Sequence, residues 1–296
     1  MKKALVLLSD GLDSRLACKI LQEQLEVEAV FFALPFISKL DKKIESIKNF
    51  CKKEKIKLYL IDVRRGKIFE DYIEIVKKPR FSRGVALNPC IDCHIFLFKE
   101  AKKIADKRKI KIIASGEVLG ERPLSQTRKS LKKIDEQLGF EVLRPLSAKL
   151  LPETTYEREK LVDREKFFSV FGRRRKTQFE LARKYKISFP HPGGGCLLCE
   201  KEYCKKLYPL LKKNKINFRD IQLLSIGRNF FESNLILGRN EKENKILEKE
   251  EGIKIIPTEP GPTALIRNKK NKLLIEKAKC LIKEYSKKEI KNFIIK

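Results

Sequence analysis

The stretch LSDGLDS at residues 8–14 stands between an apolar run, residues 4–8, and a helical pattern, residues 15–25. This order predicts a strand that passes through a polar turn into a helix. The backbone N–H groups and the positive dipole end of such a helix point at the turn and favour an anion. The sequence therefore predicts a phosphate at this turn, with a helix start that is capped by Asp10 or Asp13 and holds nothing as the alternative.

Apolar runs alternate with helical patterns through the first half of the chain. Strands are predicted at residues 4–8, 27–34, 56–63, 111–114 and 140–143, and helices at residues 15–25, 41–53, 69–77 and 91–108. This alternation is typical of an α/β fold, a doubly wound parallel sheet with helices on both faces. Ligands of such folds bind where the strands end. A nucleotide at these ends would contact the turn at residues 9–14, Phe32, Ser115 and Gly116.

The sequence predicts a nucleotide-binding domain at residues 1–150. Two further parts are predicted after it. Residues 151–204 interrupt the alternation and are interpreted as a basic linker that covers the site. Their basic run, residues 172–176, is predicted either to contact RNA or to form a solvated helix face, and residues 189–195 are too rich in Pro and Gly for regular structure. Residues 205–296 predict a smaller α+β domain. Its expected helices are residues 208–214 and 218–224, its strands residues 234–237, 254–256 and 263–267, and a basic helix closes it.

The composition indicates a globular protein with a polyanionic partner. The 296 residues are 42% hydrophobic, and 68 Lys and Arg against 39 Asp and Glu leave a net charge of +29. Such an excess favours nucleic acid as the partner, and lysines on solvated helix faces are the competing explanation. The start is too short for a signal segment, and no apolar run approaches the ~18 residues of a membrane span. A cytoplasmic protein without a membrane partner is expected.

Five of the eight cysteines stand in two tight groups, Cys90 with Cys93, and Cys196 with Cys199 and Cys204. A disulfide framework is not expected in a reducing compartment. A C-x-x-C at the start of a helix lets two thiols reach one metal or cluster, and the helix dipole lowers their pKa. The first pair alone is compatible with zinc, an iron–sulfur cluster, a redox dithiol or two buried structural cysteines. The glycines before Cys196 would let the backbone approach a cluster closely.

The turn at residues 8–14 lacks the Lys-Ser/Thr pair of a Walker P-loop and resembles the pyrophosphate loop of the PP-loop ATPases, Ser-Gly-Gly-x-Asp-Ser. Its matching residues are Ser9, Gly11, Asp13 and Ser14. The resemblance implies a Rossmann-like fold of the adenine-nucleotide alpha-hydrolase kind. It also implies Mg²⁺-dependent cleavage of ATP between the α and β phosphates, with a catalytic role for Asp13. Asp10 replaces the first glycine, and its carboxylate repels phosphate unless it points away or shares the magnesium ion.

The stretch NPCIDC at residues 88–93 resembles the corresponding segments of bacterial tRNA 2-thiouridylases and of cluster-containing tRNA thiolases, which are PP-loop enzymes. This resemblance implies that Cys90, Cys93 and Cys196 hold a 4Fe-4S cluster and that Cys93 and Cys196 take part in catalysis. Cys199 would complete a four-thiolate site, either zinc or a closed cluster. Cys204 has no counterpart in the three-cysteine scheme.

Two further stretches resemble parts of known families. Residues 115–126 resemble a Gly-Glu-x-x-Gly-x-Arg-Pro-x-Ser-Gln run of thiolase-like PP-loop proteins, which implies that Arg122 balances charge on an adenylated intermediate. A surface loop with Arg122 in an ordinary ion pair is the alternative. Segments between residues 227 and 267 resemble the small RNA-binding domain of ribosome-rescue factors of the fibronectin-binding-protein family. Phe230 or Phe231 would stack on RNA there, or belong to the core.

Together the resemblances imply an ATP-dependent tRNA sulfurtransferase. A uridine carbonyl oxygen would be adenylated and replaced by sulfur from the cluster or from a cysteine persulfide. The implied partners are tRNA and a sulfur donor, either sulfide or a cysteine desulfurase or carrier. Two alternatives are a PP-loop synthetase that acts on a small molecule and carries a structural zinc site, and a non-catalytic RNA-binding protein. The sequence leaves open the uridine, the thiolated position and the oligomeric state, a homodimer included.

Overall fold

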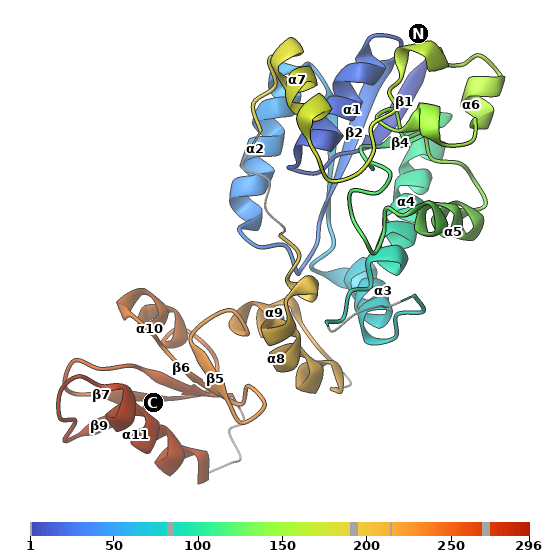
Figure 1. The fold of residues 1–296 in the computed structure, drawn as a ribbon. Helices are drawn as coiled ribbons and strands as arrows, with labels where there is room; N and C mark the ends of the chain where they lie inside the picture. Colours follow the sequence, from blue (N-terminus) through green and yellow to red (C-terminus); the bar gives the residue numbers. More distant parts are fainter. Residues whose placement is uncertain (1, 82–85, 190–194, 214, 268–272) are drawn as a thin grey trace. The chain divides into compact units, whose positions relative to one another are not determined.

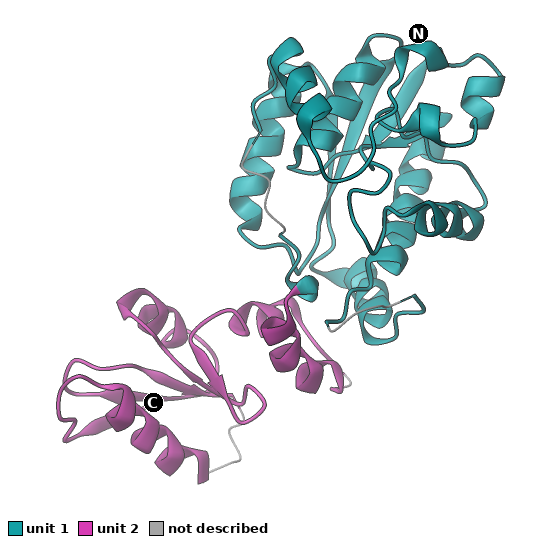
Figure 2. Cartoon of the chain, in the orientation of Figure 1, with its two compact units in different colours: residues 1–199 teal, residues 200–296 magenta. Residues whose placement is uncertain are grey.

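A computed structural model describes residues 2–81, 86–189, 195–213, 215–267 and 273–296. The chain divides into two compact units, residues 1–199 and 200–296 (Figure 2). The segment expected to be a linker therefore falls mainly in the first unit, where Phe167, Val170 and Leu181 join the core. The expected irregular stretch at residues 189–195 falls largely on residues outside the described ranges. In the described part, no helix is both long and apolar enough to cross a membrane.

The first unit is built on a parallel four-stranded sheet in the order β3-β2-β1-β4 (Figure 1). The strands are β1 (Lys3–Leu7), β2 (Glu26–Ala33), β3 (Lys57–Asp62) and β4 (Ile112–Ser115). In the register of the sheet Val6 lies between Ala29 and Ala114. Because β1 and β4 are almost completely buried, they carry continuous apolar side chains, which is why the sequence predicted them.

Helices cover both faces of this sheet and confirm the predicted α/β fold (Figure 1). One face carries α1 (Leu12–Gln22), α2 (Leu40–Lys53) and α7 (Lys176–Lys184). The other carries α4 (Cys90–Lys107) and α5 (Arg128–Leu138), with α3 (Gly66–Lys77) packed on α4. A short helix, α6 (Thr155–Arg158), follows α5. The apolar faces of α1 and α2 share one core with the sheet.

The predicted strand at residues 140–143 is wrong. Only a single bridge joins Leu143 to Ala114, although the Leu143 N–H donates to the Ile113 carbonyl at 2.9 Å. Helix α5 ends at Gly139 with a left-handed φ of 71°, and Pro145 follows two residues after the bridge. Proline has no N–H to donate to a strand ladder, so the apolar run is too short to extend the sheet.

The second unit contains a separate antiparallel sheet in the order β5-β6-β8-β7-β9. Its strands are β5 (Arg228–Phe230), β6 (Leu235–Leu237), β7 (Ile253–Pro257), β8 (Ala264–Ile266) and β9 (Phe293–Ile295). Its helices are α8 (Lys201–Leu211), α9 (Phe218–Leu223), α10 (Glu241–Leu247) and α11 (Leu273–Tyr285). Leu235 and Leu237 face the core with α11, whereas Ile236 joins Leu223 and Leu247 of α9 and α10. Both faces of the sheet are thus covered.

Candidate functional site

A cleft of about 1020 Å³ opens where β1 and β4 end. The strand order reverses between these two strands, and this is the place where open α/β sheets bind ligands. The cleft is lined by all eight residues that the sequence suggested for nucleotide contact: Ser9, Gly11, Asp13, Ser14, Phe32, Ser115, Gly116 and Arg122. The lining also includes cations that the sequence did not assign to it: Lys42, Lys43, Arg173 and Arg175.

The loop between β1 and α1 is organised by Ser14. Its Oγ accepts the Ser9 N–H at 3.0 Å and lies 2.9 Å from the Ser9 carbonyl and 3.0 Å from the Gly11 carbonyl. The N-cap residue of α1 is Gly11, which makes no side-chain cap, so the expected cap by Asp10 or Asp13 is wrong. The N–H groups of the first turn therefore face the cleft without a side-chain acceptor from the N-cap, which suits an anion.

Gly116 brings the loop after β4 into backbone contact with this first loop. A Cβ added at Gly116 would lie 2.4 Å from the Ser14 nitrogen and 2.5 Å from the Asp13 carbonyl carbon and oxygen. Real Cβ atoms do not approach backbone so closely, and a backbone neighbour cannot rotate away as a flexible side chain can. Only glycine therefore lets the two loops form one wall of the cleft.

Asp10, the residue that departs from the pyrophosphate-loop pattern, is paired with Arg15. The Arg15 guanidinium donates to the Asp10 carboxylate at 2.7 Å, to the Ser46 hydroxyl at 2.7 Å and to the Ser188 carbonyl at 2.7 Å. Arg15 is only 3% exposed, and its guanidinium carbon lies 5.0 Å above the Phe50 ring. The charge of Asp10 is therefore compensated within the protein, which removes most of the repulsion expected from a carboxylate in this position.

Replacing Asp10 with glycine is expected to destabilise the fold by about 1–3 kcal/mol, because a buried guanidinium loses its counter-ion. The affinity for magnesium pyrophosphate is expected to stay within about threefold of wild type, because the carboxylate is already neutralised. Urea denaturation and isothermal titration calorimetry measure the two quantities. Asp10→Asn, which keeps an acceptor for Arg15, is the control. A tenfold gain in pyrophosphate affinity for Asp10→Gly would show that this carboxylate repels the ligand.

Asp13 presents a buried carboxylate to the cleft. Its Oδ1 has no hydrogen-bond partner among the described residues, and its Oδ2 lies 3.6 Å from the Arg175 guanidinium. Burial, together with the neighbouring Glu121 charge, raises the pKa of Asp13 to about 6, and Arg175 opposes the shift. A carboxylate oxygen without a partner at the edge of a phosphate-binding loop is the kind of hard donor that Mg²⁺ prefers.

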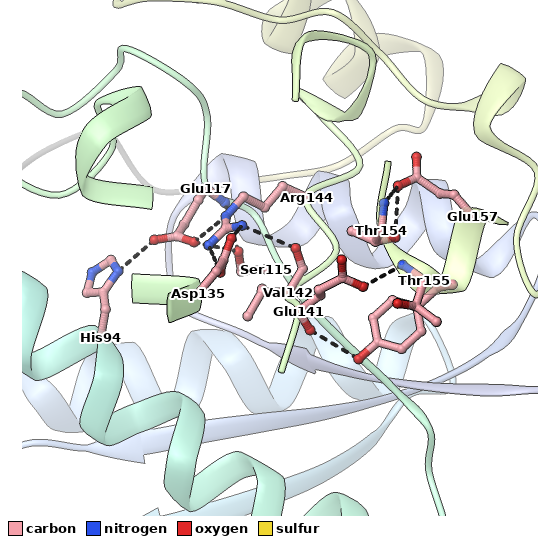
Figure 3. A network of polar contacts seen from close by, with 11 residues as sticks. His94, Ser115, Glu117, Asp135, Glu141, Val142, Arg144, Thr154, Thr155 and Glu157 are labelled. Atoms are coloured by element: carbon pink, nitrogen blue, oxygen red, sulfur yellow. Dashed lines mark hydrogen bonds and ion pairs between the residues drawn. The ribbon is translucent and has the colours of Figure 1, made fainter. Parts of the chain in front are cut away.

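A network of ion pairs and hydrogen bonds around Glu117 holds the segment after β4, which forms one wall of the cleft (Figure 3). Glu117 accepts from Arg144 at 2.9 Å and lies 2.7 Å from His94 Nδ1, while Arg144 also donates to both oxygens of Asp135 at 2.8 and 2.9 Å. Burial by itself would raise the pKa of Glu117, but Arg144 and His94 hold it at about 2. His94 and Glu117 both line the cleft. The ion pair of Glu117 with Arg144 therefore fixes the carboxylate that contacts the His94 ring.

The two cysteine groups of the first unit are brought together by backbone hydrogen bonds. The segment at residues 195–199 is tied to the end of β2, because Ser38 N–H donates to the Gly195 carbonyl and Leu197 N–H to the Phe36 carbonyl, both at 2.9 Å. The Leu198 carbonyl accepts the Asn88 N–H at 3.1 Å, just before α4. Cys196 and Cys199 are thereby held beside Cys90 and Cys93, which lie 103 or more residues earlier in the chain.

Cys199 is hydrogen-bonded to both Cys196 and Cys90, and these thiols lower the pKa of Cys199. The same hydrogen bonds and burial raise the pKa of Cys90 and Cys196, and burial raises that of Cys93 to about 11. The expected lowering by the helix dipole is therefore wrong for Cys90 and Cys93, because burial and thiol neighbours outweigh it. We call Cys90, Cys93, Cys196 and Cys199 the thiol cluster.

The thiol cluster has the donor set of a thiolate-bound metal group. Four sulfurs from two C-x-x-C pairs converge, which suits zinc or an iron–sulfur cluster. In the described ranges, however, no three His, Cys, Asp or Glu side chains are arranged to hold one metal ion. The donor chemistry therefore fits such a group, and the present side-chain positions are those of free thiols.

Three residues connect the cleft with the thiol cluster. His94 and Gly195, which both line the cleft, are the sequence neighbours of Cys93 and Cys196. Arg122 also lines the cleft, and its positive charge acts on the thiols of Cys90 and Cys199. The cleft that contains the loop suited to a phosphate is therefore also lined by residues that adjoin the thiol cluster in sequence or act on its charge.

The remaining predicted residues lie elsewhere. Cys204 is buried in α8 of the second unit, and Cys51 is buried in α2. In the second unit Phe230 packs against the core, whereas Phe231 is 42% exposed and carries the Lys277 ammonium 4.6 Å from its ring centre. The expectation that these phenylalanines are core is therefore correct for Phe230 and wrong for Phe231.

The chain is similar to one curated protein whose name is that of a tRNA-modifying enzyme. The chain is 29% identical over 144 residues to the probable tRNA sulfurtransferase of Methanocaldococcus jannaschii, a match that covers 49% of this chain and 36% of that protein. The chain thus spans about a third of the length of this curated relative.

Two solved structures share parts of the fold at 17% identity. One is the U34-tRNA thiolase NcsA from Methanococcus maripaludis with its 4Fe-4S cluster, with a TM-score of 0.38 over 76% of this chain and 73% of that one. The other is a predicted subunit of tRNA methyltransferase from Methanocaldococcus jannaschii, with a TM-score of 0.33 over 57% of this chain and 92% of that one.

A family model also matches the chain. The family described as thiamine biosynthesis protein (ThiI) matches residues 1–150, which is just over half of the 296 residues. The matched residues include the whole parallel sheet, the loop at residues 9–14, the first C-x-x-C pair and the Ser115–Glu117 wall of the cleft. The chain therefore belongs to the ThiI family.

Proposed function

We propose that this protein is an ATP-dependent tRNA sulfurtransferase. The carbonyl oxygen of a uridine attacks the α-phosphate of ATP, pyrophosphate leaves, and the base is adenylated. A sulfur nucleophile then attacks the activated carbon, and AMP leaves with the former carbonyl oxygen. The observation that carries the proposal is the single cleft that joins a phosphate-binding loop to residues adjoining four thiols.

The loop at residues 9–14 would hold the departing pyrophosphate. The N–H groups at the start of α1 offer donors for phosphate oxygens, and the free Asp13 oxygen is suited to the magnesium ion that bridges them. Arg122 would stabilise charge on the adenylated base, since it lies between this cleft and the thiols. These contacts supply positioning and charge stabilisation, the two effects on which phosphoryl and nucleotidyl transfer depend most.

The thiol cluster would supply the sulfur end of the reaction. Cys90, Cys93 and Cys196 would hold a 4Fe-4S cluster, with Cys199 placed to serve as a fourth thiolate. When bound, this group would deliver sulfide to the activated base. In the alternative, Cys93 or Cys196 would carry a persulfide received from a cysteine desulfurase or a sulfur carrier. Its outer sulfur would attack the activated carbon, a second thiol of the cluster would then displace the thiolated base from the carrier sulfur, and the resulting disulfide would be reduced by an external thiol.

The charge of the chain and the second unit support tRNA as the substrate. The net charge of +29 suits a polyanion of the size of tRNA. The exposed ring of Phe231 with Lys277 above it, and Arg228 at 4.6 Å from the Tyr285 ring centre, offer aromatic and cationic groups for unpaired RNA. The name of the Methanocaldococcus relative points in the same direction.

The direct test is anaerobic reconstitution of the full chain with iron and sulfide, followed by incubation with unmodified tRNA and magnesium ATP. We expect thiouridine, AMP and pyrophosphate in equal amounts, measured by nucleoside mass spectrometry and by nucleotide chromatography. AMP without thiouridine would contradict the proposal and favour a small-molecule acceptor. Tight tRNA binding without ATP binding would contradict it in favour of a non-catalytic RNA-binding protein.

A further inference from the structure

The loop at residues 9–14 leaves open which side chain supplies the positive charge that pyrophosphate requires. No lysine or arginine occurs within this loop, and its nearest cation, Arg15, already pairs with Asp10. Two carboxylates, Asp13 and Glu121, line the same end of the cleft. A polyphosphate that enters this end needs cations from another segment, because like charges at short range repel strongly in a partly desolvated site.

The basic run before α7 reaches into this end of the cleft. Arg173 and Arg175 both line the cleft, whereas Arg174 between them does not; Arg173 and Arg174 are exposed, and Arg175 is half-buried. The run is fastened beside the β4 loop, because Phe171 forms a bridge with Leu119 and the Gly172 N–H donates to the Leu119 carbonyl at 2.8 Å. The side chains of Arg173 and Arg175 therefore face the cleft, and that of Arg174 does not. The interpretation of the basic run as a solvated face fits Arg174 but not Arg175.

Arg175 is held directly above the loop by polar contacts. Its Nε donates to Glu121 at 3.1 Å, a second guanidinium nitrogen contacts the same carboxylate, and Asp13 lies 3.6 Å away. Glu121 in turn is 3.5 Å from the side-chain amide of Gln178, which is completely buried in α7. The Arg175 side chain is 19% exposed and lines the cleft, so a ligand can reach it.

We propose that Arg175, assisted by Arg173, is the cationic half of the pyrophosphate site. When magnesium pyrophosphate or ATP binds, the Arg175 guanidinium exchanges part of its contact with Glu121 and Asp13 for phosphate oxygens. Asp13 is then released toward the metal ion, while Glu121 and Gln178 keep the guanidinium oriented. The planar fork of arginine suits two phosphate oxygens at once. This inference rests on the proposed use of ATP.

The test measures magnesium pyrophosphate binding to the full chain by isothermal titration calorimetry. Arg175→Gln is expected to weaken binding about 10- to 100-fold, as expected for the loss of a charge-assisted contact. Arg174→Gln removes the same charge from the neighbouring position and is expected to stay within about twofold. Arg175→Lys keeps the charge but loses the fork, so it should give an intermediate loss even if the glutamine variant folds poorly.

Two further variants separate a direct phosphate contact from simple neutralisation of Glu121. Glu121→Gln frees Arg175 and should bind pyrophosphate at least as tightly as wild type, whereas Arg175→Gln with Glu121→Gln should remain weak. Restored affinity in the double variant, or equal affinities for Arg175→Gln and Arg174→Gln, would overturn the inference alone. Absence of pyrophosphate and ATP binding by the wild-type chain would overturn it together with the proposed function.

Discussion

Replacing Cys196 with serine is expected to lower thiouridine formation in tRNA by at least about 100-fold, the scale seen when a reacting group is removed. Its thiol is hydrogen-bonded to Cys199 within the thiol cluster, beside the cleft. The backbone of its segment is held independently, through Gly195 and Leu197, so the substitution should leave the fold intact. Pyrophosphate affinity is expected to remain at the wild-type level, because the loop at residues 9–14 is built from other residues.

Cys280→Ser is the matched control, since this cysteine is exposed and lies in α11 of the second unit. It should retain full thiouridine formation and full iron and sulfide content after reconstitution. Normal thiouridine formation by Cys196→Ser would contradict the role of the thiol cluster, whatever its metal content. One zinc per chain and no labile sulfide in active wild-type protein would assign the cluster a structural role instead.

The same measurements on Cys199→Ser decide how many thiolates hold the group. Cys199 contacts both Cys90 and Cys196, so the geometry gives it a more central place than the three-cysteine scheme does. We therefore expect Cys199→Ser to reduce iron content as strongly as Cys196→Ser. Full iron content and full activity in this variant would restrict the site to Cys90, Cys93 and Cys196.

The central strands β1 and β4 of the first unit could be predicted because they are buried on both faces. Ala4, Val6 and Ala114 are completely buried, so these two strands appear in the sequence as apolar runs. The loop at residues 9–14 follows such a run, and its position at the end of β1 is a consequence of the fold. The strands β5 and β9 escaped prediction because they are short, partly exposed strands at the two edges of the second sheet, whereas the equally short β6 and β8 are completely buried.

The role of individual charged residues could not be predicted in the same way. Arg173, Arg174 and Arg175 are chemically identical, and only the contact of Phe171 with Leu119 decides which of them turns toward the cleft. Arg15 likewise lies in a predicted helix, and the helical pattern does not predict its ion pair with Asp10. Such choices depend on segments far apart in the sequence, whereas a hydrophobic pattern reports mainly local structure.

The role of Arg144 could not be predicted from any sequence pattern either. Its ion pair with Glu117 is nevertheless expected to have a large effect on stability. Replacing Arg144 with methionine is expected to destabilise the first unit by about 3–5 kcal/mol at pH 7, because Glu117 would remain buried without its main counter-ion. Glu117 is 5% exposed, and its other ionisable neighbour is His94. Urea denaturation followed by circular dichroism measures the change. Arg158→Met, which removes an exposed pair with Glu141, should cost at most about 1 kcal/mol.

The pH dependence distinguishes the loss of this ion pair from a simple packing defect. The pKa of Glu117 is about 2 in the folded protein, below its ordinary value of 4.5, so its ionised form stabilises the fold above pH 4.5. This contribution is lost as the pH falls from 4.5 toward 2. In Arg144→Met burial should instead raise the pKa of Glu117, and protonation should then relieve the defect. The difference in unfolding free energy between wild type and Arg144→Met is therefore expected to shrink below pH 5, whereas a packing defect would leave it constant.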